Sequence, residues 1–396
     1  MKRYLLKLLM VTLSFATEES PEVKSPSDLI ALSQKGSYTF SPVGASDMLK
    51  TLQLLLAPSE AEHQASLEAI VGKNSAEQIA KDWKQRSSLI HWKSYTVTDE
   101  TIPLRTEGLK VLEMAGNITI KTTFSPPSLA ASLINGIVAE DTYGLIQKIL
   151  SETELHPNTS LILLNTLYVK TAWKYPLRQK KDALNFHFTG NEYCNVRASY
   201  GLINCPIYET EDTYFIELET EEKAFHMIFK LDKKGYSTAP ITSKELDHFQ
   251  KNKSYRYINL TLPHGAVTSS LDLKTILSPQ ISLLTPHTWF NSIISDQKAN
   301  VSLLKQVATV EWDEQGFSGA AATVAAIGLT SARGPAEKEI IIDRPFSFAF
   351  IQETTTTSLV LFEGSIRDME GIIAHHKSDR CYGYKPTHNF HLGGKL

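Results

Sequence analysis

Cysteine is scarce in this chain: three occur among its 396 residues, at Cys194, Cys205 and Cys381. Three cysteines are too few for the disulfide framework of a small secreted scaffold. Cys194 and Cys205 can pair across a hairpin, although we expect them to stand as separate small residues, and Cys381 is left over in either case. The composition, 42% hydrophobic and 21% charged, is ordinary for a globular protein.

An excess of charge of one sign is also missing. The formal net charge is −3, so the molecule as a whole is not an electrostatic partner for nucleic acid. No linker rich in proline, glycine or serine and no internal repeat divides the chain. One large domain of mixed α and β structure is therefore compatible with the length.

Long hydrophobic runs are absent, and no membrane span is expected. The apolar run 4–15 follows Lys2 and Arg3 and ends before a small residue, Ala16. Residues 1–16 therefore predict a secretory signal peptide, the alternative being a basic amphipathic N-terminus. A loose arm, 17–27, follows. Five glycosylation sequons agree with a secreted, extracellular protein, at Asn117, Asn158, Asn252, Asn259 and Asn300.

Proline is missing from residues 307–334, and large side chains are rare in the middle of that stretch. Every residue there can donate its backbone N–H, so the segment can pair on both edges as a central strand. Small side chains, from Gly316 through Gly319, Ala320, Ala321 and Ala322 to Thr323, let such a strand enter between two existing strands. The pattern predicts an exposed loop that can become a strand.

This stretch resembles a known family, the serpins. Glu314-Gln315-Gly316 followed by Gly319-Ala320-Ala321-Ala322-Thr323 resembles the hinge of the serpin reactive loop. Asp343-Arg344-Pro345-Phe346 and Leu361-Phe362-Glu363-Gly364 resemble the strands after it. The resemblance covers 28–369. It implies an α+β single domain with three β-sheets, eight or nine helices and an exposed reactive-centre loop, 314–344, whose hinge is 314–323.

The strand and helix patterns around the loop fit the same family. The apolar run 160–170 predicts a strand buried on both faces, and 128–150 predicts one amphipathic helix. By resemblance, Ser41 and Asn165 belong to the hydrogen-bonded shutter of the main sheet, and Trp173 is the tryptophan of the breach, where the hinge enters. Gly44 replaces a shutter serine, and Gln306 stands where a histidine is usual.

The function that the resemblance implies is inhibition of serine proteases as a suicide substrate, by loop cleavage and insertion. No catalytic residue or cofactor is needed, and a monomer is expected. Counting the family's usual hinge length places the scissile bond at Thr330-Ser331, which suits an elastase-like target. Arg333-Gly334 is the alternative for a trypsin-like target. Phe317 stands at the first inward-facing hinge position, where we expect it to oppose insertion by overpacking.

Two other functions remain open. A serpin-fold protein without inhibitory activity, such as a carrier, a chaperone or a storage protein, is the first. The second is a serine hydrolase with Ser318 as nucleophile and Asp343 and His375 as partners, although the motif has Ala320 where a nucleophile elbow has glycine.

The remaining charged and histidine-rich segments predict no ligand. Lys81, Lys84, Arg86 and Lys93 form a modest basic cluster that acidic residues interrupt, so we expect a solvated face and no glycosaminoglycan site. The tail 370–396 predicts a disordered extension without a metal site, because its ligand-type residues match no standard zinc spacing: His375, His376, Cys381, His388 and His391.

Overall fold

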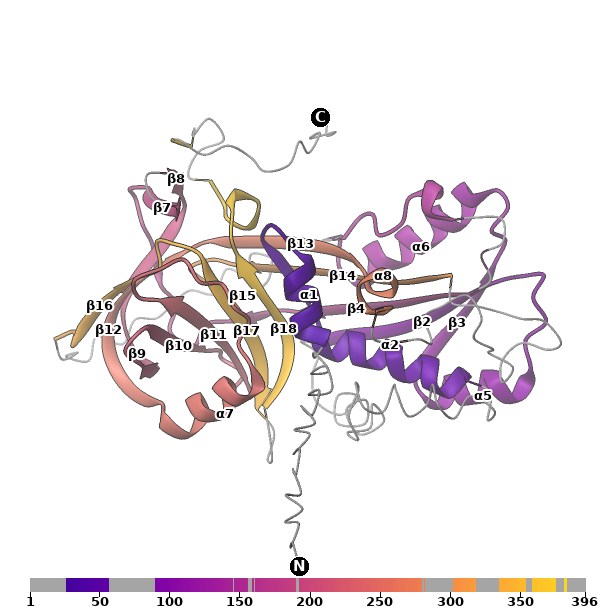
Figure 1. Ribbon diagram of the computed structural model, residues 1–396, viewed down its shortest axis with the longest axis horizontal. Helices are drawn as coiled ribbons and strands as arrows, with labels where there is room; N and C mark the ends of the chain where they lie inside the picture. The colour runs from indigo at the N-terminus through magenta and orange to yellow at the C-terminus, as the bar shows by residue number, and fades with distance from the viewer. Residues whose placement is uncertain are drawn as a thin grey trace, which may run out of the picture.

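The computed structural model (Figure 1) combines six α-helices and three β-sheets in the residues that it describes. These are residues 26–56, 90–144, 146–155, 159, 161–189, 192–279, 281, 302–317, 335–353, 358–374 and 381–382. Three sheets in one α+β fold agree with the sequence-based expectation. None of the helices in the described ranges is long and apolar enough to cross a membrane.

The seven-stranded main sheet holds the strand that the sequence predicts as doubly buried. Its order is β3 (Asn117–Thr122), β2 (Ile90–Asp99), β4 (Leu161–Val169), β14 (Leu303–Trp312), β15 (Gly316–Phe317) and β5 (Thr171–Ala172), and β13 (Gly265–Asp272) also pairs with β14. Strand β4 is apolar on both faces because both faces are covered. Leu161 and Leu163 pack in one core cluster, and Ile162 and Leu164 pack in another.

Helices cover the two faces of the main sheet (Figure 1). The bounds are α1 (Pro26–Ser33), α2 (Pro42–Leu55), α5 (Thr106–Met114), α6 (Pro127–Asp141) and α8 (Leu273–Leu277). Helix α6 buries Ile134 and Val138 against the outer face, whereas α2 packs in the cluster on the inner face.

The predicted helix over 128–150 is too long. Helix α6 ends at Asp141, because Tyr143 and Gly144 take positive φ angles of 52° and 82° that no right-handed helix contains. The chain then turns back along its own helix. Asn135 Oδ1 accepts hydrogen bonds from the backbone N–H groups of Ile149 and Leu150, at 2.8 and 2.9 Å.

The nine-stranded second sheet packs beside the main sheet and supplies most of the aromatic core. Its order is β1 (Tyr38–Phe40), β18 (Ser358–Ile366), β17 (Phe346–Glu353), β11 (Phe225–Asp232), β10 (Thr213–Glu219), β9 (Ala198–Glu209), β12 (Ser254–Pro263) and β16 (Lys338–Ile341), with β6 (Arg178–Gln179) on β9. Helix α7 (Ser243–Asn252) packs on the face of this sheet that carries Phe215, Ile228 and Ile351.

The third sheet is the hairpin of β7 (Leu184–Thr189) and β8 (Glu192–Val196). Two short 3-10 helices lie at Glu152–Glu154 and Met369–Gly371.

The expectations for the cysteines and for the start of the tail are wrong. Cys194 forms a disulfide with Cys381, across 187 positions, and Cys205 is the free, buried cysteine. Sequence spacing could not show this pairing, because only the fold brings the tail to β8. Ile372 and Ala374 form β-bridges to Gly265 and Val196. The described part of 370–396 is therefore ordered against β8 and β13.

Candidate functional site

The first two residues after the hinge turn are already a strand. In β15, Gly316 and Phe317 pair with Ala172 and Thr171 on one edge, and Phe317 pairs with Trp312 on the other. Glycine is required at 316, since a Cβ there would lie 2.3 Å from the carbonyl oxygen of Thr171. The hinge thus begins between β5 and β14, as a strand of the main sheet.

The side chain of Phe317 is already packed in the hydrophobic core. Its side chain is 2% exposed, and its ring stacks on Phe350 with centroids 4.1 Å apart and planes 7° apart. Phe362 lies against its other side, at 6.0 Å. The expectation that Phe317 must find room during insertion is wrong, because the cavity that holds it exists before insertion.

Trp173 holds the turn that leads from β14 into the hinge. Its indole Nε1 donates to the carbonyl of Asp313 at 2.9 Å, and its backbone N–H donates to the carbonyl of Gln315 at 2.8 Å. The Asp313 carboxylate accepts hydrogen bonds from the backbone N–H groups of Gln315 and Gly316, which stabilise the turn. The predicted breach tryptophan therefore fixes the direction in which the hinge enters.

Glu314 contacts a buried histidine at the same place. His264 Nε2 lies 2.6 Å from Ser199 Oγ and 3.4 Å from Glu314 Oε2. Burial lowers the pKa of His264, and the carboxylate of Glu314 opposes that effect only in part. The neutral form of the imidazole is therefore favoured at neutral pH. It shares one hydrogen bond with Ser199, whose direction depends on which ring nitrogen carries the proton.

Below the hinge, the main sheet is open between its two central strands. Within the described ranges, β4 and β14 pair only where Leu303–Gln306 runs beside Ile162–Asn165. Beyond that point β14 pairs with β13 on its other edge, and β4 pairs with β2 on its other edge. The edges formed by 166–169 and 307–311 thus lack a common partner strand, and we call this gap the slot.

The slot ends at Gln306, whose side chain makes two hydrogen bonds to the backbone of Ser41. Its Oε1 accepts from the N–H of Ser41 at 2.8 Å, and its Nε2 donates to the carbonyl of Ser41 at 3.0 Å. Ser41 also caps α2, since its Oγ accepts from the N–H of Gly44 at 3.1 Å. Gln306 therefore joins β14 to the start of α2.

Gly44 and Gln306, the two departures from the family pattern, fit each other. A Cβ on Gly44 would lie 2.3 Å from Asn165 Oδ1 and 2.8 Å from Gln306 Nε2. A serine at 44 has no room beside this glutamine. The two replacements thus form one alternative packing of the shutter, and they do not count as two independent losses.

Asn165 extends the network away from the slot. Its Nδ2 donates to Ser94 Oγ at 2.9 Å, and Ser94 Oγ donates to the buried carboxylate of Asp47. Burial raises the pKa of Asp47 to about 6, against the hydrogen bond from Ser94. Asn165 Oδ1 is buried and has no hydrogen-bond partner in the described part of the chain. The shutter therefore contains a vacant acceptor.

The assignment of Ser41, Asn165 and Trp173 to the shutter and the breach stays a prediction. Sequence reasoning did not find the hydrogen-bond partners Ser94 and Asp47. Asp47 carried a signal, since it is a lone acid on the apolar face of α2. Nothing in the sequence pointed to Phe350, because its contact with Phe317 depends on how the two sheets pack.

Several predicted site residues lie outside the described ranges. These are the reactive-bond residues Thr330, Ser331, Arg333 and Gly334, the hinge residues Gly319 to Thr323, and the hydrolase candidates Ser318 and His375. Asp343, the acid of the hydrolase alternative, pairs with Arg344, and its carbonyl accepts from the N–H of His187.

The sequons differ in accessibility. Asn117 is buried, and its Nδ2 donates to Thr51 Oγ1 at 3.0 Å, so the atom that a glycan would modify is occupied. We therefore withdraw Asn117 as a glycosylation candidate. Asn252 and Asn259 are exposed, and Asn158 and Asn300 lie outside the described residues.

In the basic cluster of the sequence, Lys93 forms an ion pair with Asp141.

Comparison with known proteins agrees with this geometry. The family model for serpins, described as "serine protease inhibitor", matches residues 27–369. Serpin A3-8 of Bos taurus is 28% identical over 255 residues, which are 62% of this chain and 59% of that protein. The match thus spans about three-fifths of the relative.

Solved structures share the fold at low sequence identity. Serpin48 of the insect Tenebrio molitor has a TM-score of 0.70 at 21% identity, covering 87% of this chain and 94% of that one. Human thyroxine-binding globulin has a TM-score of 0.74 at 18% identity, with 87% and 97% covered. Because the family model matches residues 27–369, which are most of its length, the chain belongs to the serpin family.

Proposed function

We propose that this protein inhibits serine proteases as a suicide substrate, through cleavage of loop 314–344 and insertion of its hinge into the main sheet. The observation that carries the proposal is β15: at the mouth of the slot, Gly316 and Phe317 already pair with β5, and Phe317 also pairs with β14. Insertion then extends an existing strand, which avoids the unfavourable first pairing.

The register of β15 defines where each hinge residue goes. Phe317 pairs with Thr171 and with Trp312. Six antiparallel steps further, Thr323 falls opposite 165 on one strand and 306 on the other. Asn165 and Gln306 are themselves paired in the intact sheet. The two edges therefore give the same register, and residues 318–322 fill the slot without breaking a β4–β14 pair.

Thr323 is the residue at which insertion must begin to separate β4 from β14. Alternation places 317, 319, 321 and 323 on the inner face. The hydroxyl of Thr323 then reaches the shutter, where the Oδ1 of Asn165 lacks a donor. A hydrogen bond there contributes about 0.5–1.5 kcal/mol to the inserted form alone. The vacant acceptor thus favours the inserted state.

The chemistry on the loop belongs to the protease. Its serine attacks the bait bond and forms an acyl-enzyme. Insertion of the freed hinge then displaces the protease before deacylation, and the metastable intact form supplies the free energy. The protein itself acts as a secreted monomer without a cofactor. The bait bond is Thr330-Ser331 for an elastase-like target or Arg333-Gly334 for a trypsin-like one.

Cleavage by a non-target protease, followed by thermal melting, tests the proposal. We expect the cleaved protein to melt at a clearly higher temperature than the intact one, because a complete strand has been added to the sheet. An unchanged midpoint would place the protein with serpins that do not insert their loop, and a carrier or storage function would replace inhibition.

Thr323→Val separates insertion from other effects of cleavage. The variant keeps the shape of threonine but removes the donor. We expect it to lower the midpoint of the cleaved form only, whereas Thr323→Ser should behave as wild type. Mass spectrometry of the fragment released from a protease complex then identifies the bond: a new N-terminus at Ser331 supports Thr330-Ser331, and one at Gly334 replaces it.

A further inference from the structure

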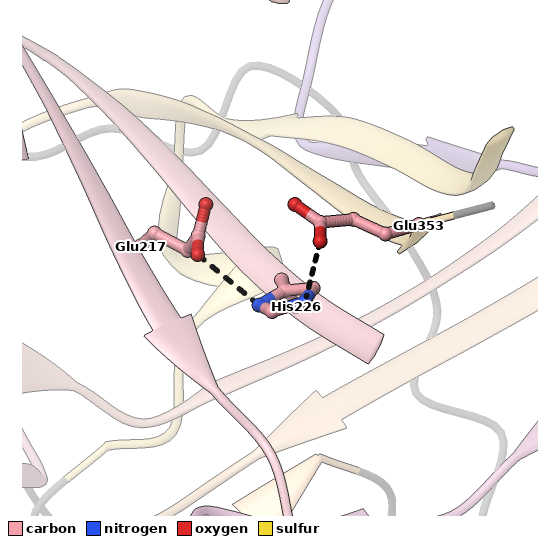
Figure 2. A group of neighbouring side chains, drawn as sticks. All are labelled: Glu217, His226 and Glu353. Atoms are coloured by element: carbon pink, nitrogen blue, oxygen red, sulfur yellow. Dashed lines mark ion pairs between the residues drawn. The ribbon is translucent and has the colours of Figure 1, made fainter. Parts of the chain in front are cut away.

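Three titratable side chains meet on the face of the second sheet that α7 covers. Figure 2 shows Glu217 on β10, His226 on β11 and Glu353 on β17. The strand register explains the meeting. Glu217 pairs with Ile228, two residues from His226, and His226 pairs with Ile351, two residues from Glu353. All three therefore point to one face as neighbours.

The imidazole lies between the two carboxylates. His226 Nδ1 is 3.1 Å from Glu217 Oε1, and His226 Nε2 is 3.6 Å from Glu353 Oε2. His226 is 5% exposed and Glu217 is 1% exposed. Even so, neither ring nitrogen has an aligned hydrogen bond in the described part of the chain. Buried polar atoms are nearly always hydrogen-bonded. These two nitrogens make only ion-pair contacts with carboxylates, so one of them is available to a metal ion.

A lysine supplies the cation that the cluster holds in the intact chain. Lys253 Nζ lies 2.9 Å from Glu217 Oε2 and 3.3 Å from Glu353 Oε1. Two carboxylates thus face one ammonium and one imidazole, and an ion that enters the cluster must replace the ammonium.

We propose that Glu217, His226 and Glu353 form a zinc site in which the ion displaces the ammonium of Lys253. One imidazole nitrogen with carboxylate oxygens is a ligand set that zinc accepts, whereas calcium and magnesium prefer oxygen alone. The site is independent of loop insertion, since none of its residues belongs to the hinge, the slot or the shutter.

The geometry fits after a small closure. One ligand atom from each of the three residues can be chosen so that all lie within 4.8 Å of one another. Zinc bonds of about 2.0–2.2 Å in a tetrahedron place ligand atoms about 3.4 Å apart. Glu353 makes the adjustment, because its side chain is 39% exposed, and Lys253, at 20%, can turn toward solvent. Water takes the fourth position.

Zinc titration of the full-length chain, first treated with a chelator, tests the site by calorimetry and thermal melting. We expect one zinc ion to bind and to raise the melting midpoint. His226→Gln should bind at least tenfold more weakly, and His248→Gln, at an exposed histidine on α7, should bind as wild type. Equal zinc affinity in His226→Gln would overturn the proposal, because the ion would then be bound elsewhere.

The variant Lys253→Met tests the same site if His226→Gln does not fold. Removing the competing ammonium should tighten zinc binding at least tenfold, and cobalt in place of zinc should give the visible absorption of a site with nitrogen and oxygen ligands. A cluster that is only an ion-pair network predicts the reverse: Lys253→Met loses stability, and zinc does not restore it. That result, or an unchanged affinity, would overturn the displacement.

Discussion

The rings of Phe317 and Phe350 lie 4.1 Å apart and 7° from parallel, although one belongs to the hinge of the main sheet and the other to β17 of the second sheet. This stack fastens the start of the reactive loop to the aromatic core. In the proposed mechanism, insertion would start from this fixed residue, and we expect the same contact in the inserted form.

Phe317→Ala should destabilise the intact and the cleaved forms by similar amounts. Removing a buried phenylalanine costs about 3–5 kcal/mol, and the ring occupies the same cavity in both states. Urea unfolding of both forms measures the two losses, with Leu129→Ala, at an exposed position, as the control. A loss confined to the cleaved form would mean that Phe317 enters the core only on insertion.

Gly44→Ser should destabilise the intact protein by about 1–3 kcal/mol, through overpacking. The added Cβ meets Asn165 Oδ1 at 2.3 Å, whereas nothing lies within 4 Å of a Cβ on Gly136 in α6. Gly136→Ser is therefore the matched control, and its unfolding free energy should change by less than about 1 kcal/mol. Equal behaviour of the two variants would contradict the close packing of Gly44 with Asn165.

Ala321→Arg should convert an inhibitor into a substrate. In the register of β15, residue 321 falls beside Ala308 on the inner face, where an arginine would be buried without a partner. Ala320→Arg is the control, because 320 falls beside Thr309 on the partly exposed outer face. Complexes that resist SDS should form with Ala320→Arg and not with Ala321→Arg. The opposite ranking would shift the register by one residue.

Acidification should stabilise the protein through Asp47. Burial raises the pKa of this carboxyl to about 6, above the value near 4 of an unfolded chain. The folded state therefore binds the proton more tightly. The contribution, about 3 kcal/mol, is fully present below pH 4 and is lost as pH rises through 6. Urea unfolding at pH 4.5 and 7.5 should show about 2 kcal/mol of this contribution in wild type, and Asp47→Asn should lose that part of the difference. An exposed acid changed likewise, Asp182→Asn, should retain it.

Reduction should lower the melting midpoint through the Cys194–Cys381 bond. A disulfide that closes so long a loop contributes about 2–4 kcal/mol. Cys381→Ser should lose that stability and should no longer respond to reductant. Cys205→Ala should still respond, because Cys205 is the free cysteine. A wild-type midpoint that reductant leaves unchanged would mean that the tail adds no stability through this bond.

Local pattern and family resemblance together predicted much of the frame. The run 160–170 became β4, and Asn165 and Trp173 make hydrogen bonds to Ser94 and to the turn before β15. These elements are readable because periodicity and motif spacing are local properties. The contacts that decide function were not readable, since each joins distant segments: Phe317 to Phe350, Gly44 to Gln306, and Cys194 to Cys381.

Strand β1 has consequences for how the chain is made. Its partner is β18, and Thr39 Oγ1 donates to the carbonyl of Glu363 across 324 positions. At synthesis rates of about 5–20 residues per second, β1 waits roughly 20–60 s for that partner. Throughout this interval the edge of β1 that pairs with β18 stays unpaired, on a strand that carries Tyr38 and Phe40, both fully buried in the finished fold. A nascent chain of this protein is thus a candidate client for chaperones that bind short aromatic segments.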